Sequence, residues 1–161
     1  MLTTLNRVVG MPVVLRDACI GYVERALADE DYRWLQGLVI RRGIGLAHWL
    51  PRESILLIGQ ECVLAGQAAK RMPSLQERQP VQAFLATGQW VGLVSDAVLQ
   101  GDTMQLKALE ISKGPLYSLF GSRDYARQYH IAREASTGRA VVQRLTTWTQ
   151  LQGSLREGEE E

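Results

Sequence analysis

An internal repeat constrains this chain more than any other feature of its sequence. Residues 20–40, "IGYVERALADEDYRWLQGLVI", align without a gap with residues 91–111, "VGLVSDAVLQGDTMQLKALEI", at an offset of 71. Glycine lies opposite glycine at the second position of both segments, at Gly21 and Gly92. A chain of 161 residues that carries one pattern twice is expected to fold as two similar units.

The sequence of the first copy predicts a series of short strands. Between residues 7 and 65, apolar and β-branched runs such as "VVGMPVVL" and "WLQGLVIRR" alternate with turn signals such as "DEDY" and "GIG". Turn signals about every 8–12 residues between short strands are typical of a small β-sandwich or β-barrel. "DEDY" is interpreted as a solvated turn and "RRGIG" as a hairpin, because neither has the spacing of a calcium or phosphate loop.

The second copy follows the same course from about Pro80 to Leu145. "PVQAFLATG" also fits a short helix, but the repeat aligns it with "VGMPVVLRD", so we predict a strand. "LPRE" (50–53) recurs as "IARE" (131–134) at an offset of 81, which indicates ten additional residues in the second copy. The segment "GQAAKRMPSLQERQ" between the copies is polar and contains proline, as a linker or a short helix would.

We therefore predict an all-β fold of two tandem units with a short linker. The expected boundaries are 1–70 for the first unit, 71–79 for the linker, 80–150 for the second unit, and 151–161 for an acidic disordered tail. The tail is predicted because "GSLREGEEE" combines four Glu with one Arg and has no apolar periodicity. The whole chain has a formal net charge of +1, so the remainder carries +4, which is mildly basic.

The sequence contains no pattern that indicates catalysis or metal binding. Cys19 and Cys62 have neither metal-site nor disulfide spacing, which suits reduced thiols in a cytoplasmic protein. His48 and His130 precede the two matched segments and are interpreted as strand or turn residues. No segment reaches the roughly 20 apolar residues that span a bilayer, and the N-terminus lacks a signal-peptide pattern. We expect no enzyme activity, no cofactor, no metal, no membrane insertion and a cytoplasmic location.

The strands and turns of the first copy form the pattern "VVGMPVVLRDACIGYVERALADEDYRWLQGLVIRR" followed by "HWLPRESILLIGQECV". This pattern resembles that of the PRC-barrel domain. It is similar to the small β-barrel of the photosynthetic reaction-centre H subunit's cytoplasmic part and of the C-terminal domain of the ribosome-maturation protein RimM. The second copy is more divergent, with Ala132 and Ser136 where the family pattern has proline and isoleucine. The resemblance implies two tandem PRC-type β-barrels and a non-catalytic docking or adaptor role, in a family common in bacteria and archaea.

Two hypotheses for function follow. The first is a non-enzymatic protein-interaction module whose partner is another protein or a second copy of the chain. The alternative is an RNA- or ribosome-associated maturation or assembly factor, which the arginine content favours (Arg41, Arg42, Arg123, Arg127, Arg133, Arg139 and Arg144). The acidic tail and the absence of a basic–aromatic stacking motif argue against nucleic acid as the partner.

The additional residues of the second copy supply the candidate interaction surface. The segment "SKGPLYSLFGSRDYARQYH" (112–130) concentrates apolar, aromatic and arginine side chains, the types that dominate binding hot spots. Ser122 also fits the N-cap of a short helical turn that carries two of these tyrosines. The other interpretation is that the aromatic residues pack over their own barrel or against the first copy. The candidate residues are Tyr117, Leu119, Phe120, Arg123, Tyr125, Arg127 and Tyr129.

Overall fold

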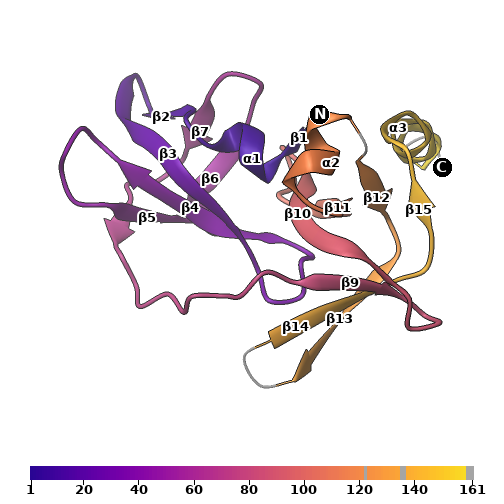
Figure 1. Cartoon of the computed structure of the whole chain (residues 1–161). Coiled ribbons are helices and arrows are strands. Elements are labelled where there is room, and N and C mark those ends of the chain that lie inside the picture. Colours follow the sequence, from indigo (N-terminus) through magenta and orange to yellow (C-terminus); the bar gives the residue numbers. More distant parts are fainter. Residues whose placement is uncertain (122, 135–136, 159–161) are drawn as a thin grey trace. The chain divides into compact units, whose positions relative to one another are not determined.

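The computed structural model describes residues 1–121, 123–134 and 137–158 of the chain (Figure 1). The described chain is mostly β and contains two sheets, one of which curls into a half-barrel, so the expected β-rich character is confirmed. It divides into two compact units. Unit 1 comprises Met1–Gln76 and Ala97–Lys107, and unit 2 comprises Glu77–Asp96 and Ala108–Glu161. Residues 97–107 of the second copy thus belong to unit 1, which differs from the predicted boundary at residue 80.

The first sheet is built from short strands that follow one another closely in sequence. Its order within the described residues is β6-β7-β2-β3-β4-β5-β8, with β7 parallel to β2 and the other pairs antiparallel (Figure 1). A single 3-10 turn, η1, separates β5 from β6. The elements are β2 (Pro12–Leu15), β3 (Ala18–Ala28), β4 (Leu35–Arg41), β5 (His48–Pro51), η1 (Arg52–Ser54), β6 (Ile55–Ile58), β7 (Val63–Ala65) and β8 (Lys70–Arg71).

The second sheet repeats this arrangement. Its order is β13-β14-β9-β10-β11-β12-β15, and the parallel pair β14–β9 corresponds to β7–β2 of the first sheet. The N-terminal strand β1 (Leu2–Thr4) adds to the end of β10. The elements are β9 (Gln82–Leu85), β10 (Trp90–Gln100), β11 (Leu106–Ser112), β12 (Asp124–Ala126), β13 (Tyr129–Glu134), β14 (Thr137–Val142) and β15 (Leu145–Thr146).

The glycines that reveal the repeat occupy the same structural position in both sheets. Gly21 on β3 has φ +152° and Gly92 on β10 has φ +142°, a region that L side chains rarely adopt. A Cβ atom at Gly21 would lie 3.0 Å from the Arg41 carbonyl oxygen, and one at Gly92 would lie 2.7 Å from the Ser112 carbonyl oxygen. Arg41 and Ser112 are themselves 71 positions apart, so the offset seen in the sequence is preserved in the backbone.

The offset changes after β11, inside the segment that the sequence indicated (112–130), but by five residues at this point and not by ten. Leu38 on β4 pairs with Leu50 on β5, and Leu109 on β11 pairs with Ala126 on β12. The strand equivalent to β5 is therefore β12, at an offset of 76, and not the "IARE" segment at an offset of 81. The connection between these strands has six residues in the first copy (42–47) and eleven in the second (113–123).

Leu38 and Leu109, which are equivalent in the repeat, are fully buried in the apolar cores of unit 1 and unit 2. In unit 1 the fully buried side chains include Leu35, Leu38, Leu50 and Ile58, and the short helix α1 (Leu5–Val8) adds Leu5 and Val8. In unit 2 they include Leu109, Ile111 and Leu151. Val63 on β7 and Ala140 on β14 lie at the parallel pairings and are completely buried. Apolar burial of this kind is the main source of stability in each unit.

Two helices lie outside the predicted strands, one in the 112–130 segment and one in the predicted disordered tail. Helix α2 (Pro115–Leu119) lies in the connection between β11 and β12, and helix α3 (Trp148–Glu157) covers most of the predicted disordered tail. Thr147 and Gln150 form a reciprocal capping box at the start of α3, and Leu151 and Leu155 are buried. Residues 159–161 of the predicted tail lie outside the described residues.

Candidate interaction surface

The connection between β11 and β12 projects a short helix from unit 2. The Ser112 hydroxyl donates to the Gly114 carbonyl oxygen at 3.1 Å, and the Gly114 backbone N–H donates to the Ser112 hydroxyl at 3.3 Å. Gly114 has φ +147°, and Pro115 follows as the first residue of α2. Proline suits that position because its fixed φ matches a helix and its missing N–H is not needed there. The turn therefore determines where α2 begins.

Helix α2 and the residue after it expose four large apolar side chains. Leu116 is 68% exposed, Tyr117 52%, Leu119 79% and Phe120 84%. We call these four residues the α2 patch. Single exposed apolar residues are common on protein surfaces, but four within five positions form a contiguous group, which is typical of a surface that another molecule covers.

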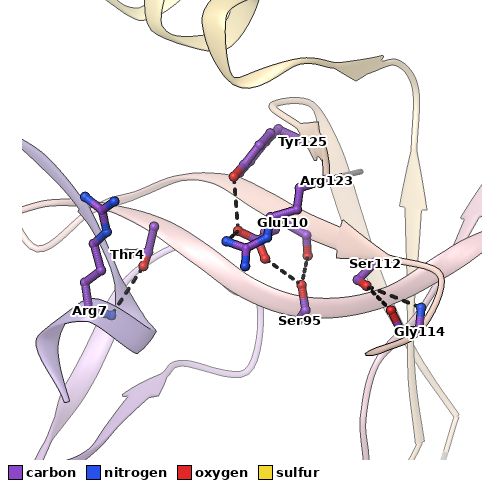
Figure 2. A network of polar contacts seen from close by, with 8 residues as sticks. All are labelled: Thr4, Arg7, Ser95, Glu110, Ser112, Gly114, Arg123 and Tyr125. Carbon is purple, nitrogen blue, oxygen red and sulfur yellow. Dashed lines mark hydrogen bonds and ion pairs between the residues drawn. The ribbon is translucent and has the colours of Figure 1, made fainter. Parts of the chain in front are cut away.

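A buried carboxylate lies below this connection. Glu110 on β11 is buried, and its Oε1 accepts a hydrogen bond from the Ser95 hydroxyl at 3.0 Å while its Oε2 accepts one from the Tyr125 hydroxyl at 3.1 Å. The Arg123 guanidinium lies 3.8 Å from the same Oε2. Figure 2 shows Tyr125 and Arg123 converging on Glu110 from one side and Ser95 approaching from the neighbouring strand. These donors stabilise a charge that would otherwise be costly to bury.

The carboxylate also changes the acidity of its tyrosine partner. Burial, followed by the negative charge of Glu110 and the hydrogen bond to it, raises the pKa of Tyr125 to about 12. The phenol therefore stays neutral and remains a hydrogen-bond donor at any physiological pH. Tyr125 and Glu110 are best described as a structural pair that connects β12 to β11.

Helix α3 packs against β12 through the same tyrosine. The rings of Tyr125 and Trp148 have centroids 5.2 Å apart and are tilted by 51°, a geometry that aromatic pairs favour. At the other end of the helix, Arg127 Nη1 donates to the Ser154 carbonyl oxygen at 3.0 Å. A cation near the last turn also suits the negative end of the helix dipole. The C-terminal segment is thus anchored at both ends of α3.

A cavity of about 660 Å³ lies between the start of α3 and the β11–β12 connection. Its walls combine the aromatic rings of Tyr117, Tyr125 and Trp148 with the cations of Lys113 and Arg123. Tyr117 belongs both to this cavity and to the α2 patch, so the two features are continuous. An apolar group that carries a negative charge would match the rings and the two cations.

The structure separates six of the seven predicted site residues into an exposed and a buried group. Tyr117, Leu119, Phe120 and Arg123 have exposed side chains on or beside the β11–β12 connection. Tyr125 and Tyr129 are buried and lie on strands β12 and β13, so they contribute to the core and not to the surface. The helical turn expected to carry both tyrosines is not present among the described residues, and Ser122, its expected cap, lies outside them.

Arg127, the remaining predicted site residue, is exposed but binds the C-terminal end of α3. Leu116, in contrast, is part of the α2 patch and was not predicted. The sequence did contain a signal for it, because Pro115 is followed by four residues that suit a short helix.

The equivalent connection in unit 1 also exposes apolar side chains. Ile44 and Leu46, in the β4–β5 hairpin, are highly exposed. The hairpin predicted from "RRGIG" is confirmed: Gly43 has φ +61°, and Arg41 Nη1 donates to the Gly45 carbonyl oxygen at 2.7 Å. Arg41 also pairs with Glu24 at 3.1 Å, so its charge stabilises the hairpin.

The histidines do not occupy equivalent positions. His48 on β5 pairs with Ile40, and its structural counterpart is Asp124, which pairs with Ile111 on β11. His130 lies on a different strand, β13. Among the described residues, no group of three or more His, Cys, Asp or Glu side chains is arranged to hold a metal ion. No helix in the described part of the chain is long and apolar enough to span a membrane.

The comparison with protein-family models gave no match, and the search of curated proteins found no related sequence.

Proposed function

We propose that this chain is a non-enzymatic protein-interaction module, an adaptor built from two PRC-barrel-like units, which binds a protein partner through the α2 patch. The observation that carries the proposal is the group of four exposed apolar side chains on one short connection. Burying such a group in an interface removes it from water, which is the dominant favourable contribution to protein association.

The chemistry around the α2 patch indicates the kind of partner. Lys113 and Arg123 line the adjacent cavity, whose third charged residue is Asp124. A partner surface with an apolar centre and a carboxylate at its edge would contact the α2 patch and the two cations together. Charge complementarity of this type increases the association rate and the specificity more than the affinity.

The buried carboxylate of unit 2 supports a structural role over a catalytic one. Glu110 already accepts hydrogen bonds from Ser95 and Tyr125 and lies next to Arg123. A general acid or base must exchange its proton with a substrate, whereas this carboxylate is occupied by donors from its own unit.

The test is to replace Leu119 and Phe120 together with serine. The matched control is Leu56→Ser, which changes another highly exposed leucine on β6 in unit 1. A protein captured by the wild-type chain and by Leu56→Ser, and then purified, should bind the double variant more weakly. Loss of two hot-spot side chains corresponds to about 2 kcal/mol or more, or roughly 30-fold in Kd.

The melting temperatures of the three proteins should agree, since the substituted side chains are exposed. An unchanged Kd for the purified partner would contradict the proposal. A lower melting temperature only in the double variant would instead show that the α2 patch packs on the protein itself.

A further inference from the structure

Two hairpin ends pair with each other inside unit 1. The end of the β3–β4 hairpin (residues 28–35) meets the end of the β10–β11 hairpin (99–106). Leu35 N–H donates to the Met104 carbonyl oxygen at 2.9 Å, and Leu106 N–H donates to the Arg33 carbonyl oxygen at 2.9 Å. Between these two hydrogen bonds, Trp34 and Gln105 lie opposite each other in an antiparallel bridge.

This pairing is symmetric with respect to the repeat. Arg33, Trp34 and Leu35 become Met104, Gln105 and Leu106 when 71 is added to each number. If the two copies are exchanged, each of the two hydrogen bonds therefore becomes the other one. A contact in which the same surface is used on both sides is isologous, the type of contact that joins the subunits of a two-fold symmetric dimer.

The hydrogen bonds inside the two hairpin ends are also related by the offset of 71. Asp29 N–H donates to the Trp34 carbonyl oxygen at 2.8 Å, and Gln100 N–H donates to the Gln105 carbonyl oxygen at 2.8 Å. The two ends are therefore copies of one structure, and each provides the surface that the other requires.

The second hairpin end is also deeply embedded in unit 1. Val98, Leu99, Met104 and Leu106 are all buried, and Ile58 N–H donates to the Gly101 carbonyl oxygen at 2.8 Å. Strand β1 pairs along the same segment, from Leu2 opposite Gln100 to Thr4 opposite Val98. Residues 1–76 supply these contacts, so residues 1–76 of another copy can supply them equally well.

The connection between the copies permits such an exchange. Residues 72–80 carry neither helix nor strand and are mostly exposed. A segment of this length can extend to about 30 Å, at roughly 3.3–3.6 Å per residue. No regular element has to unfold in this connection for residues 97–107 to leave one unit 1 and enter another.

We propose that two copies of this chain form a dimer by exchanging these hairpin ends, so that residues 97–107 of each copy enter unit 1 of the other. In this dimer Trp34 of one copy lies opposite Gln105 of the other, and the contacts between the two hairpin ends are retained. Exchange of identical elements needs little additional stabilisation because no new interface has to be created. The closed monomer dominates in dilute solution, since a flexible linker provides an effective concentration in roughly the mM range.

The test uses two full-length chains that each carry one new cysteine. Both contain Cys19→Ser and Cys62→Ser; one adds Trp34→Cys and the other adds Gln105→Cys. Trp34 and Gln105 form a non-hydrogen-bonded pair, whose Cα atoms are typically about 4.5 Å apart, within the range of a disulfide. A closed chain with one of these cysteines has no partner cysteine at the paired position.

The two chains are unfolded, mixed in equal amounts, refolded together at roughly 1 mM and then oxidised. The proposal predicts a disulfide between position 34 of one chain and position 105 of the other, in large excess over disulfides between two identical chains. Equal amounts of mixed and identical pairs would mean random collision and would overturn the proposal, as would the absence of disulfide-linked dimers.

Trp34→Cys also removes the contact between the Trp34 ring and the Arg52 guanidinium, which lie 5.0 Å apart. A second measurement therefore uses the wild-type chain. The wild-type chain is refolded at low and high concentration, and its mass is measured by light scattering. The dimer fraction should rise with the refolding concentration. It should vanish in a chain that carries both new cysteines and has been oxidised at low concentration, because the disulfide then closes each chain on itself. A wild-type chain that stays monomeric at every concentration overturns the proposal.

Discussion

The two copies of the repeat differ most in the connection that follows their longest hairpin. On both sides of that connection the strands pair in the same way: Leu38 lies opposite Leu50 in the first copy, and Leu109 lies opposite Ala126 in the second. Between these strands the first copy has a hairpin connection of six residues. The second copy has a turn followed by helix α2, after which the chain enters β12. The five additional residues are contained entirely in this connection.

This difference shows how one scaffold can carry two different surfaces. The first connection is held by Arg41, which contacts both Glu24 and the Gly45 carbonyl oxygen, and it exposes Ile44 and Leu46. The second exposes the larger α2 patch beside a cavity. A longer connection costs little, because the entropy of loop closure grows slowly with length. The core preserves the repeat, and the connections determine what the surface can bind.

Alanine substitutions at two matching buried leucines test whether the two cores are equivalent, and they should have the largest effect on stability. Leu38 and Leu109 are both completely buried at the same position of the repeat. Leu38→Ala and Leu109→Ala should each lower the free energy of unfolding by about 2–5 kcal/mol, since each leaves a cavity. Chemical denaturation of the two variants measures this. A difference of several kcal/mol between them would show that the copies pack differently.

A second pair of variants compares the two glycines that occupy matching positions of the repeat. Both Gly21 and Gly92 have a positive φ, and alanine at either position should cost about 1–3 kcal/mol in backbone strain. Gly92→Ala should cost more, because its Cβ would lie 2.7 Å from the Ser112 carbonyl oxygen and 2.9 Å from Ile111 Cγ2. The nearest atom to a Cβ at Gly21 is 3.0 Å away. Equal losses of stability in denaturation experiments would contradict this ranking.

Much of the sheet structure could be predicted because the repeat itself carries the information. Strands β4 and β11 have bounds that differ by the offset of 71, and "PVQAFLATG" contains strand β9 as the alignment requires. Strand β12 was missed because it has only three residues and lies inside what resembled an insertion. Its pairing with β11 depends on contacts between distant residues, which a local pattern does not specify.

Helix α3 was missed although its sequence contained the relevant signals. Thr147 and Gln150 have capping-box spacing, and Leu151 and Leu155 are four residues apart. The run of glutamates at the end of the chain obscured this pattern. The candidate site was predicted in part, because aromatic content identifies a segment but not the direction of each side chain. Tyr117 is exposed on helix α2 and Tyr125 is buried on strand β12, a difference that aromatic content does not reveal.

A third prediction concerns the buried pair that only the second copy contains. Tyr125→Phe removes the donor to Glu110 Oε2 and should cost about 1–3 kcal/mol of stability near neutral pH. The pKa of Tyr125 is raised from its usual value of 10.0 to about 12, so the folded state retains this proton longer than the unfolded state. The associated stability is fully present below pH 10 and is lost as the pH rises towards 12.

Denaturation of the wild type and of Tyr125→Phe at several pH values measures this contribution. The difference in stability between the two proteins should shrink above pH 10. A difference that stays constant across this range would show that the tyrosine titrates normally.

The most direct test of the proposed role exchanges the connections themselves. In this variant the residues "KGPLYSLFGSR" (113–123) are replaced by "RGIGLA", the sequence of residues 42–47. The flanking strands pair in the same register in both copies, so the fold should survive with little loss of stability. Arg123 is also removed, but its guanidinium is half-exposed and lies 3.8 Å from Glu110, and the hydrogen bonds from Ser95 and Tyr125 to that carboxylate remain.

The decisive measurement is the Kd of this connection variant for the purified partner, compared with that of the wild-type chain. Binding should fall by roughly 30-fold or more while the melting temperature changes little, because the α2 patch is absent and the scaffold is intact. A folded variant that binds the partner with wild-type affinity would contradict the account and place the interaction surface elsewhere on the protein.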